Sequence, residues 1–223
     1  MRARYVPTPE LEELLDPEAG GWKSTSSETL KLEGTPLGMQ LTAHIRATWG
    51  ERKIGAVESV SVSAVHDGRL LAFRFEWDSP QESRTTEDND QFPDATAIML
   101  PSTPQSPIFT MGAPDQAVNV WYWRADDERG RHVVAEGFGT SRTVDFDQVS
   151  ARGTWKEGRW HVVIARALRV ETPEAVAQLE PGAATGFGVA VWDGSNGERA
   201  GIKAFSGPQW LELRLDAVPT AGS

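Results

Sequence analysis

A period-two alternation of polarity in two neighbouring segments limits the fold more than any other feature of the sequence. In ESVSVSAV, residues 58–65, apolar residues alternate with serine, and in LAFRFEW, residues 71–77, large apolar side chains alternate with small or polar ones. Side chains of a β-strand point alternately to its two faces, so each segment is expected to form a strand with one buried face. The intervening His-Asp-Gly at 66–68 predicts a turn, and the two strands are therefore expected to form an antiparallel hairpin.

Strand patterns recur along the rest of the chain. A second hairpin is expected where Trp155 and Trp160 flank a Lys-Glu-Gly turn. Further strands are expected at residues 118–123, 186–192 and 210–215.

Helices are predicted at two places only. Thr8 and Thr172 are each followed by proline and glutamate, and threonine caps helices while proline favours their first position. Because helices are scarce and strands are many, we expect an all-β fold, an antiparallel two-sheet β-sandwich with a few short helices. The length of 223 residues suits a single domain spanning residues 1–223.

Two long segments interrupt the strand pattern. Residues 78–94 are polar and acidic, and residues 101–114 contain four prolines. Long loops without their own secondary structure are uncommon in compact domains and tend to be functional or mobile. Both segments are therefore of interest for function.

Charge and composition exclude several classes of function. The formal net charge is -10, so the basic surface expected of a nucleic-acid-binding protein is missing. The absence of cysteine excludes disulfides, cysteine-based zinc sites, iron-sulfur ligation by this chain and covalent haem attachment. No apolar run approaches the ~20 residues of a membrane span, and no apolar signal region follows Arg2 and Arg4.

Three catalytic or metal-binding hypotheses have little support. The sequence has no G-x-S-x-G motif for a hydrolase nucleophile, and no pair of acidic residues is singled out as glycosidase carboxylates. A calcium loop of the EF-hand type beginning at Asp193 would need glycine and glutamate where the chain has Glu198 and Ala204. The DGSNG segment is instead expected to be a tight turn.

Nine tryptophans are many for this length. Exposed in a row on a β-sandwich they would stack on sugar rings, whereas buried they fill the core. We expect most of them in the core, and a carbohydrate-binding module is the alternative function.

Three residues have the chemistry of ligands to a soft or borderline metal. Lys203 is the only lysine in the last 67 residues, and lysine, unlike arginine, loses its proton when buried and becomes a nitrogen donor. Met111 lies among prolines in SPIFTMGAP, where a stiff loop can hold a thioether towards a cavity, while Met99 lies in an apolar run. Core packing for the methionines and a solvated surface position for Lys203 remain the alternatives.

Two stretches resemble a known family. They are ATAIMLPSTPQSPIFTMGAPDQAVNVWYWRAD, residues 95–126, and GFGVAVWDGSNGERAGIKAFSGPQWLEL, residues 186–213. Both are similar to the haem b subunit, or gamma subunit, of type II dimethyl sulfoxide reductase family enzymes, the group that includes the gamma subunits of ethylbenzene, dimethyl sulfide and chlorate-converting complexes.

The resemblance implies that the β-sandwich holds one non-covalent haem b at one end, with a methionine and a lysine as axial ligands. Matching the motifs by position assigns Lys203 as the amine ligand and Met111 as the thioether ligand, with Met99 as the other candidate. The strand with Trp121 and Trp123 is expected to line the haem or to pack beneath it.

Arginines near the proposed ligands are expected to pair with the haem propionates, because a guanidinium binds a carboxylate through two hydrogen bonds. Arg199 is the first candidate and Arg124 the second.

The resemblance further implies a non-catalytic electron-transfer subunit, because two protein ligands leave the iron no open position. The expected partners are a molybdenum-cofactor catalytic subunit and an iron-sulfur subunit in a heterotrimer, and an external redox protein such as a cytochrome. A periplasmic location is expected, for a mature chain or one exported with a partner, and cytoplasmic action stays open. The substrate of the complex and the direction of electron flow are not written in this sequence.

Overall fold

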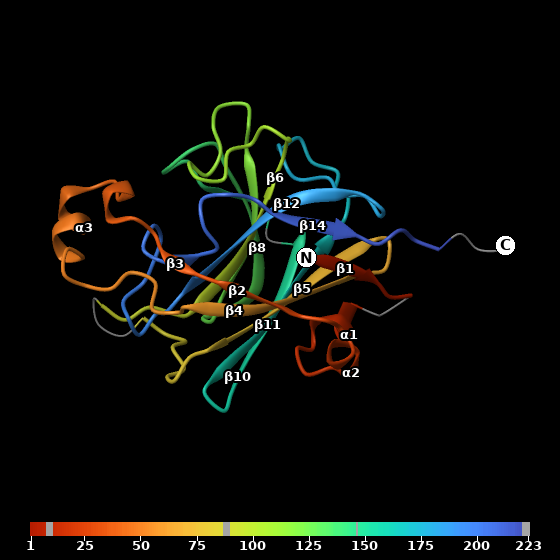
Figure 1. Cartoon of the computed structure of the whole chain (residues 1–223), viewed down its shortest axis with the longest axis horizontal. Helices are drawn as coiled ribbons and strands as arrows, with labels where there is room; N and C mark the ends of the chain where they lie inside the picture. Colours follow the sequence, from red (N-terminus) through yellow and green to blue (C-terminus); the bar gives the residue numbers. More distant parts are fainter. Residues whose placement is uncertain (8–10, 87–89, 146, 220–223) are drawn as a thin grey trace.

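The chain folds into two β-sheets packed face to face (Figure 1). The computed structural model describes residues 1–7, 11–86, 90–145 and 147–219. The predicted helix start at Thr8 lies outside the described residues. The two-sheet architecture with few short helices confirms the predicted β-sandwich.

The first sheet is built around the predicted 58–77 hairpin. That hairpin is present as β4 (Ser59–His66) and β5 (Leu70–Asp78), with Val62 opposite Phe75. In order across the sheet the strands are β10 (Val149–Lys156), β11 (Arg159–Ala167), β5, β4, β1 (Arg2–Tyr5), β14 (Leu211–Leu215) and β12 (Ala184–Trp192), and β2 (Glu28–Lys31) also pairs with β4. The β10–β11 pair is the second predicted hairpin, with Trp155 opposite Trp160.

The second sheet shares β12 with the first. The first half of β12 pairs with β14, and its second half, from Gly188, pairs with β6. The order continues as β12, β6 (Ala95–Pro101), β7 (Val118–Arg124), β8 (Asp127–Ala135) and β9 (Arg142–Asp145), and the short strands β13 (Ala204–Phe205) and β3 (Glu33–Gly34) follow on the other side of β12.

One strand departs from the expected antiparallel pairing. β1 runs parallel to both of its neighbours, β14 and β4. Both neighbours are distant from β1 in sequence, so no tight hairpin dictates the strand direction here.

Tryptophans interlock in the core between the sheets. Trp77 and Trp160 come from the first sheet and Trp123 from the second, and the ring centroids of Trp123 and Trp160 lie 5.0 Å apart. Phe73 packs edge-on against Trp121 across the same interface, at 5.7 Å. Most of the tryptophans are buried, as expected from the sequence.

The helices are α1 (Leu11–Leu15), α2 (Gly20–Lys23), α3 (Ala43–Thr48) and the 3-10 turn η1 (Leu37–Met39). The helix predicted from Thr172 is wrong, because residues 171–180 form no helix and only a bend at residues 173–174. The Thr172 hydroxyl does accept a hydrogen bond from the Glu174 N–H, as in a cap. Beyond it, however, the Ala177 carbonyl accepts from buried Arg166 and the Leu179 N–H donates to Leu168, so the backbone bonds to the body of the fold instead of to itself.

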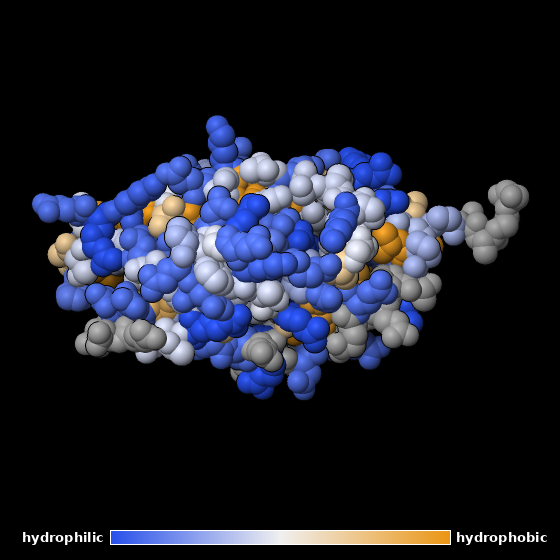
Figure 2. Space-filling view, turned by 90° about the horizontal axis from the view of Figure 1, so that it is seen from below, coloured by the Kyte–Doolittle hydropathy of each residue, from blue (hydrophilic) through white to orange (hydrophobic). Residues whose placement is uncertain are grey.

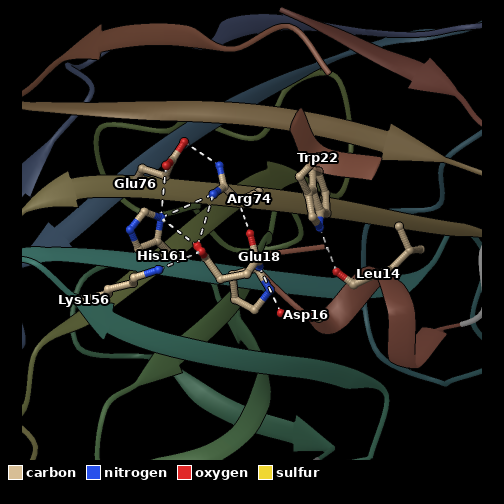
Figure 3. A network of polar contacts seen from close by, with 9 residues as sticks. Leu14, Asp16, Glu18, Trp22, Arg74, Glu76, Lys156 and His161 are labelled. Atoms are coloured by element: carbon tan, nitrogen blue, oxygen red, sulfur yellow. Dashed lines mark hydrogen bonds and ion pairs between the residues drawn. The ribbon is translucent and has the colours of Figure 1, made fainter. Parts of the chain in front are cut away.

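The helices α1 and α2 cover part of the outer face of the first sheet (Figure 3). The Trp22 indole N–H donates to the Leu14 carbonyl over 3.0 Å, and both side chains pack on the sheet. Beside them, Arg74 of β5 forms an ion pair with Glu76, and the Nδ1 atom of His161 lies 3.0 Å from the Glu76 carboxylate. This side of the sandwich is therefore closed by the chain itself.

The face shown in Figure 2 is largely hydrophilic, and apolar residues form only small separate patches on it. Among the described helices, none has the length and apolar character needed to cross a membrane.

Candidate functional site

A cavity of about 550 Å³ lies on the outer face of the second sheet. Its size falls within the range of small-molecule sites, about 300–1,000 Å³. We expected the cofactor at one end of the sandwich, but this cavity lies over a face of one sheet. The residues around it are Thr35, Met39, Gln40, Leu41, Ile45, Ala97, Met99, Ile108, Phe109, Met111, Val120, Tyr122, Arg131, Val133, Phe138, Gly139, Ser141, Arg142, Thr143, Gly188, Val189, Ala190, Trp192, Ala200, Gly201, Lys203, Phe205 and Ser206.

The floor of the cavity consists of alternate residues of the sheet. Met99 of β6, Val120 and Tyr122 of β7, and Trp192 of β12 face outwards into it. Their sequence neighbours, such as Trp121, face the core between the sheets. The alternation of side chains along a strand therefore separates the cavity from the core by the thickness of one sheet.

Loops and the segment that contains η1 and α3 form the walls. The proline-rich segment between β6 and β7, singled out in the sequence, contributes Ile108 and Phe109. This loop approaches β12 closely at Gly188, where a Cβ atom would lie 2.6 Å from Cδ1 of Ile108. Any larger residue at this position would push the end of the Ile108 side chain away from the sheet.

Lys203 is buried in the wall of the cavity. Only 8% of the residue is exposed, and its Nζ atom lies 5.3 Å from the centroid of the Trp192 ring. In the described part of the chain, no hydrogen bond or ion pair is made by Nζ. Burial without a carboxylate partner lowers the pKa of Lys203 to about 8, so a neutral amine is accessible near neutral pH.

The backbone around Lys203 is held in place on both sides. Thr35 donates its N–H to the Lys203 carbonyl over 3.0 Å, next to the β3–β13 pair. Upstream, the DGSNG segment forms the expected turn. The buried carboxylate of Glu198 accepts the Asp193 N–H, and buried Asp94 accepts the Gly194 N–H over 2.8 Å.

Those two carboxylates are strongly desolvated. Burial raises the pKa of Asp94 to about 6 and raises the pKa of Glu198 above its ordinary value. Each accepts several N–H groups, which offsets part of the cost of burying it. They anchor the turn that leads to Lys203.

Two thioethers reach the same cavity. Met111 lies in a turn with φ of 57°, an uncommon left-handed conformation for a residue with a side chain. The turn is fixed because the Met111 N–H donates to Ile108 and the Met111 carbonyl accepts from Gly137. Met99 lies in the middle of β6, paired with Gly188 on one side. The structure brings both methionines and Lys203 to one cavity.

Other predicted residues lie outside the cavity. Trp121 and Trp123 pack in the core on the opposite face of β7. Arg199 is exposed and stacks on the Phe92 ring at 4.3 Å, while Arg124 forms an ion pair with Asp126.

Among the residues that line the cavity, the sequence interpretation did not single out Tyr122, although it expected its strand to line the haem or pack beneath it, nor Trp192, Arg131 or Arg142. The rings of Tyr122 and Trp192 meet edge to face at 5.4 Å. Alternation in β7 points to Tyr122 once the neighbouring tryptophans are assigned to the core. The two arginines lie on β8 and β9, strands that the period-two pattern did not predict.

Comparison with known proteins places the chain in a family. The family model described as ethylbenzene dehydrogenase matches residues 19–148 and 141–204. The chlorate reductase subunit gamma of Ideonella dechloratans is 35% identical over 72% of this chain and 66% of the relative. The dimethylsulfide dehydrogenase subunit gamma of Rhodovulum sulfidophilum is 28% identical over 67% of this chain and 58% of the relative. The match thus spans 66% of the length of the first gamma subunit and 58% of the second, less than two thirds of either.

A further relative covers more of the sequence. A Haloferax mediterranei protein named as a respiratory nitrate reductase haem subunit is 28% identical over 91% of this chain and 69% of the relative.

Solved structures with the same fold are carbohydrate-binding proteins. A family 9 carbohydrate-binding module from Caldicellulosiruptor kristjanssonii, in complex with glucose, has a TM-score of 0.51 at 11% identity and covers 98% of this chain and 96% of its own. A Bacteroides uniformis protein described as carbohydrate-binding has a TM-score of 0.54 at 10% identity, covering 97% and 98%. At this identity the likeness shows the fold alone.

The family model covers most of the chain, and the chlorate reductase subunit gamma is 35% identical over 72% of it. The chain therefore belongs to the ethylbenzene dehydrogenase family, which includes gamma subunits of type II dimethyl sulfoxide reductase family enzymes.

Proposed function

We propose that this chain binds one haem b non-covalently in the cavity on the second sheet and acts as an electron-transfer subunit, not a catalytic one. The observation that carries the proposal is a buried lysine amine without an acid partner, set in one apolar cavity with two thioethers. Apolar walls suit a porphyrin, and amine and thioether are both donors that haem iron accepts.

Lys203 and Met111 are the proposed axial ligands. A lysine must lose its proton to bind iron, and the lowered pKa of Lys203 makes that loss inexpensive near neutral pH. Met111 is favoured over Met99 because it occupies a strained backbone conformation, and such strain concentrates at functional sites. The chain has no cysteine to form thioether bonds to the haem vinyl groups, which supports non-covalent binding.

When bound through two protein ligands, the haem supplies one-electron chemistry with no open coordination position for a substrate. The names of the relatives, subunits gamma of chlorate reductase and of dimethylsulfide dehydrogenase, support the same role. The proposed partners are a molybdenum-cofactor subunit and an iron-sulfur subunit in a heterotrimer, and a cytochrome as external partner. The proposed location is the periplasm.

The visible spectrum of the purified chain tests the proposal. We expect a low-spin haem spectrum with a sharp α band after reduction. Lys203→Ala and Met111→Ala should each give a high-spin spectrum or lose the haem, while Met99→Leu should remain low-spin. Wild-type spectra from both alanine variants would reject the ligand assignment, and a low-spin Met111→Ala with a high-spin Met99→Leu would reassign the thioether.

Carbohydrate binding is the second candidate. It is favoured by the fold shared with family 9 modules and by the presence of Tyr122 and Trp192 in the cavity. Against it, most tryptophans are buried in the core and do not form an exposed platform. A colourless protein that is retarded by a polysaccharide in affinity electrophoresis would favour this candidate over haem binding.

A further inference from the structure

Arg131 differs from the other cavity residues in carrying a buried hydrogen-bond donor without a partner. It lies on β8 and lines the cavity. Its Nε atom is buried, and no described residue accepts a hydrogen bond from it. Because this atom has almost no accessible surface, a molecule in the cavity meets the terminal nitrogens of the partly exposed guanidinium and not Nε.

The position of the guanidinium is fixed by two contacts. One terminal nitrogen, Nη2, lies 3.2 Å from a carboxylate oxygen of Asp127, and the group lies over the Tyr122 ring at 5.9 Å from its centroid. These contacts hold the guanidinium in one orientation, and no described residue forms a hydrogen bond with its other terminal nitrogen, Nη1. A planar guanidinium with free donors is the group that best binds a carboxylate.

Two cationic side chains, Lys203 and Arg131, flank the aromatic part of the cavity floor. The Lys203 amine lies over Trp192, the Trp192 ring meets Tyr122, and Tyr122 lies under Arg131. The two cations thus border an aromatic floor on opposite sides. About a quarter of the Arg131 side chain is exposed, 26%, against 8% exposure of Lys203, so the arginine lies nearer to solvent.

We propose that Arg131, positioned by Asp127, binds a carboxylate of the molecule in the cavity and so fixes which edge of that molecule faces β8. The inference rests on the proposed function, in which the carboxylates are the propionates of haem b. The Lys203 amine at one side would then bind the metal, and the Arg131 guanidinium at the other side would bind the acid groups. Arg142 also lines the cavity but is more exposed and forms an ion pair with Glu174, so it is not the anchor.

A porphyrin that lacks free carboxylates provides the test. The full-length chain, freed of haem, is titrated with haem b and with haem b dimethyl ester, and binding is followed by the Soret band. For Arg131→Gln we expect the affinity for haem b to fall by about 10- to 100-fold, as for a lost hydrogen bond to a charged group. The affinity for the ester should be the same in the variant and the wild type.

Three variants sharpen the comparison. Arg199→Gln, outside the cavity, should leave both affinities unchanged. Arg131→Lys keeps the charge but not the planar geometry, and should give an intermediate loss for haem b alone. Asp127→Asn should weaken haem b binding less than Arg131→Gln does. Thermal unfolding of each variant identifies losses that follow from misfolding, which would lower both affinities together.

The outcomes separate the inference from the proposed function. Equal losses for haem b and the ester in a folded Arg131→Gln chain, or no loss, would overturn the role of Arg131 while low-spin binding by the wild type still supported haem binding. Failure of the wild type to bind either porphyrin would overturn the proposed function and this inference with it.

Discussion

Replacing Lys203 with methionine is expected to make the haem-free chain more stable, although it removes the proposed ligand. The pKa of Lys203 falls from 10.5 to about 8 on burial, because the charged amine is desolvated without a compensating partner. One pKa unit corresponds to about 1.36 kcal/mol, so this shift in the pKa of Lys203 lowers the stability of the folded chain at pH 7 by roughly 3 kcal/mol. Methionine is similarly long, unbranched and uncharged, so it removes this cost.

The pH dependence of the stability difference distinguishes this electrostatic effect from a gain that comes only from better packing. Below pH 8 the lysine is protonated in both the folded and the unfolded chain, and its full cost is present. Between pH 8 and 10.5 the unfolded chain binds more protons than the folded chain, so the wild type gains stability as the pH rises. The advantage of Lys203→Met should therefore be largest at or below pH 8 and should shrink towards pH 10.5.

Urea unfolding of the haem-free chain, from pH 7 to pH 10, measures the effect. At pH 7 the expected gain corresponds to a rise in Tm of roughly 6–12 °C for a domain of this size. Lys31→Met, which replaces an exposed lysine, serves as the control and should change little at any pH. A Lys203→Met chain that is no more stable at pH 7, or a difference that does not depend on pH, would refute the argument.

Three further predictions follow from buried residues. Gly153→Ala should lower stability by about 1–3 kcal/mol in urea unfolding, since its Cβ would lie 2.2 Å from the Trp123 ring in the core, and an unchanged midpoint would contradict this packing. Asp94→Asn should remove a gain in stability that the wild type shows as the pH falls from about 6 towards 4, because the folded chain binds the Asp94 proton more tightly than the unfolded chain. His66→Leu should protect the chain below pH 6.5, since neither buried ring nitrogen of His66 has a hydrogen-bond partner among the described residues and burial lowers its pKa; equal acid sensitivity of variant and wild type would argue against it.

The strand pattern of the sequence was a good guide to the sandwich where local and long-range signals agree. The 58–77 hairpin and the Trp155–Trp160 hairpin are both present because alternation and turn chemistry point the same way. The Thr172 segment shows the opposite case. Its cap signals are satisfied locally, but its backbone forms hydrogen bonds with Arg166 and Leu168 and no helix, and no local pattern reveals those contacts.

The candidate site was only partly predictable. Lys203 and Met111 stood out by residue type and motif, and the structure brings both to the cavity. The position of the cavity over a face of the sheet depends on how β12 passes between the two sheets, which no local pattern encodes. Arg131 lies in a charged stretch without alternation, and its place at the cavity beside Asp127 and Tyr122 is visible only in the folded chain.

The two faces of β7 have a practical consequence for mutagenesis. Residues 118, 120 and 122 belong to the cavity side, and residues 119, 121 and 123 belong to the core side. A scan along these six positions should therefore give two interleaved sets of phenotypes, with changes in pigment retention at even numbers and changes in melting behaviour at odd numbers. Adjacent codons of one strand would thus report separately on cofactor retention and on folding.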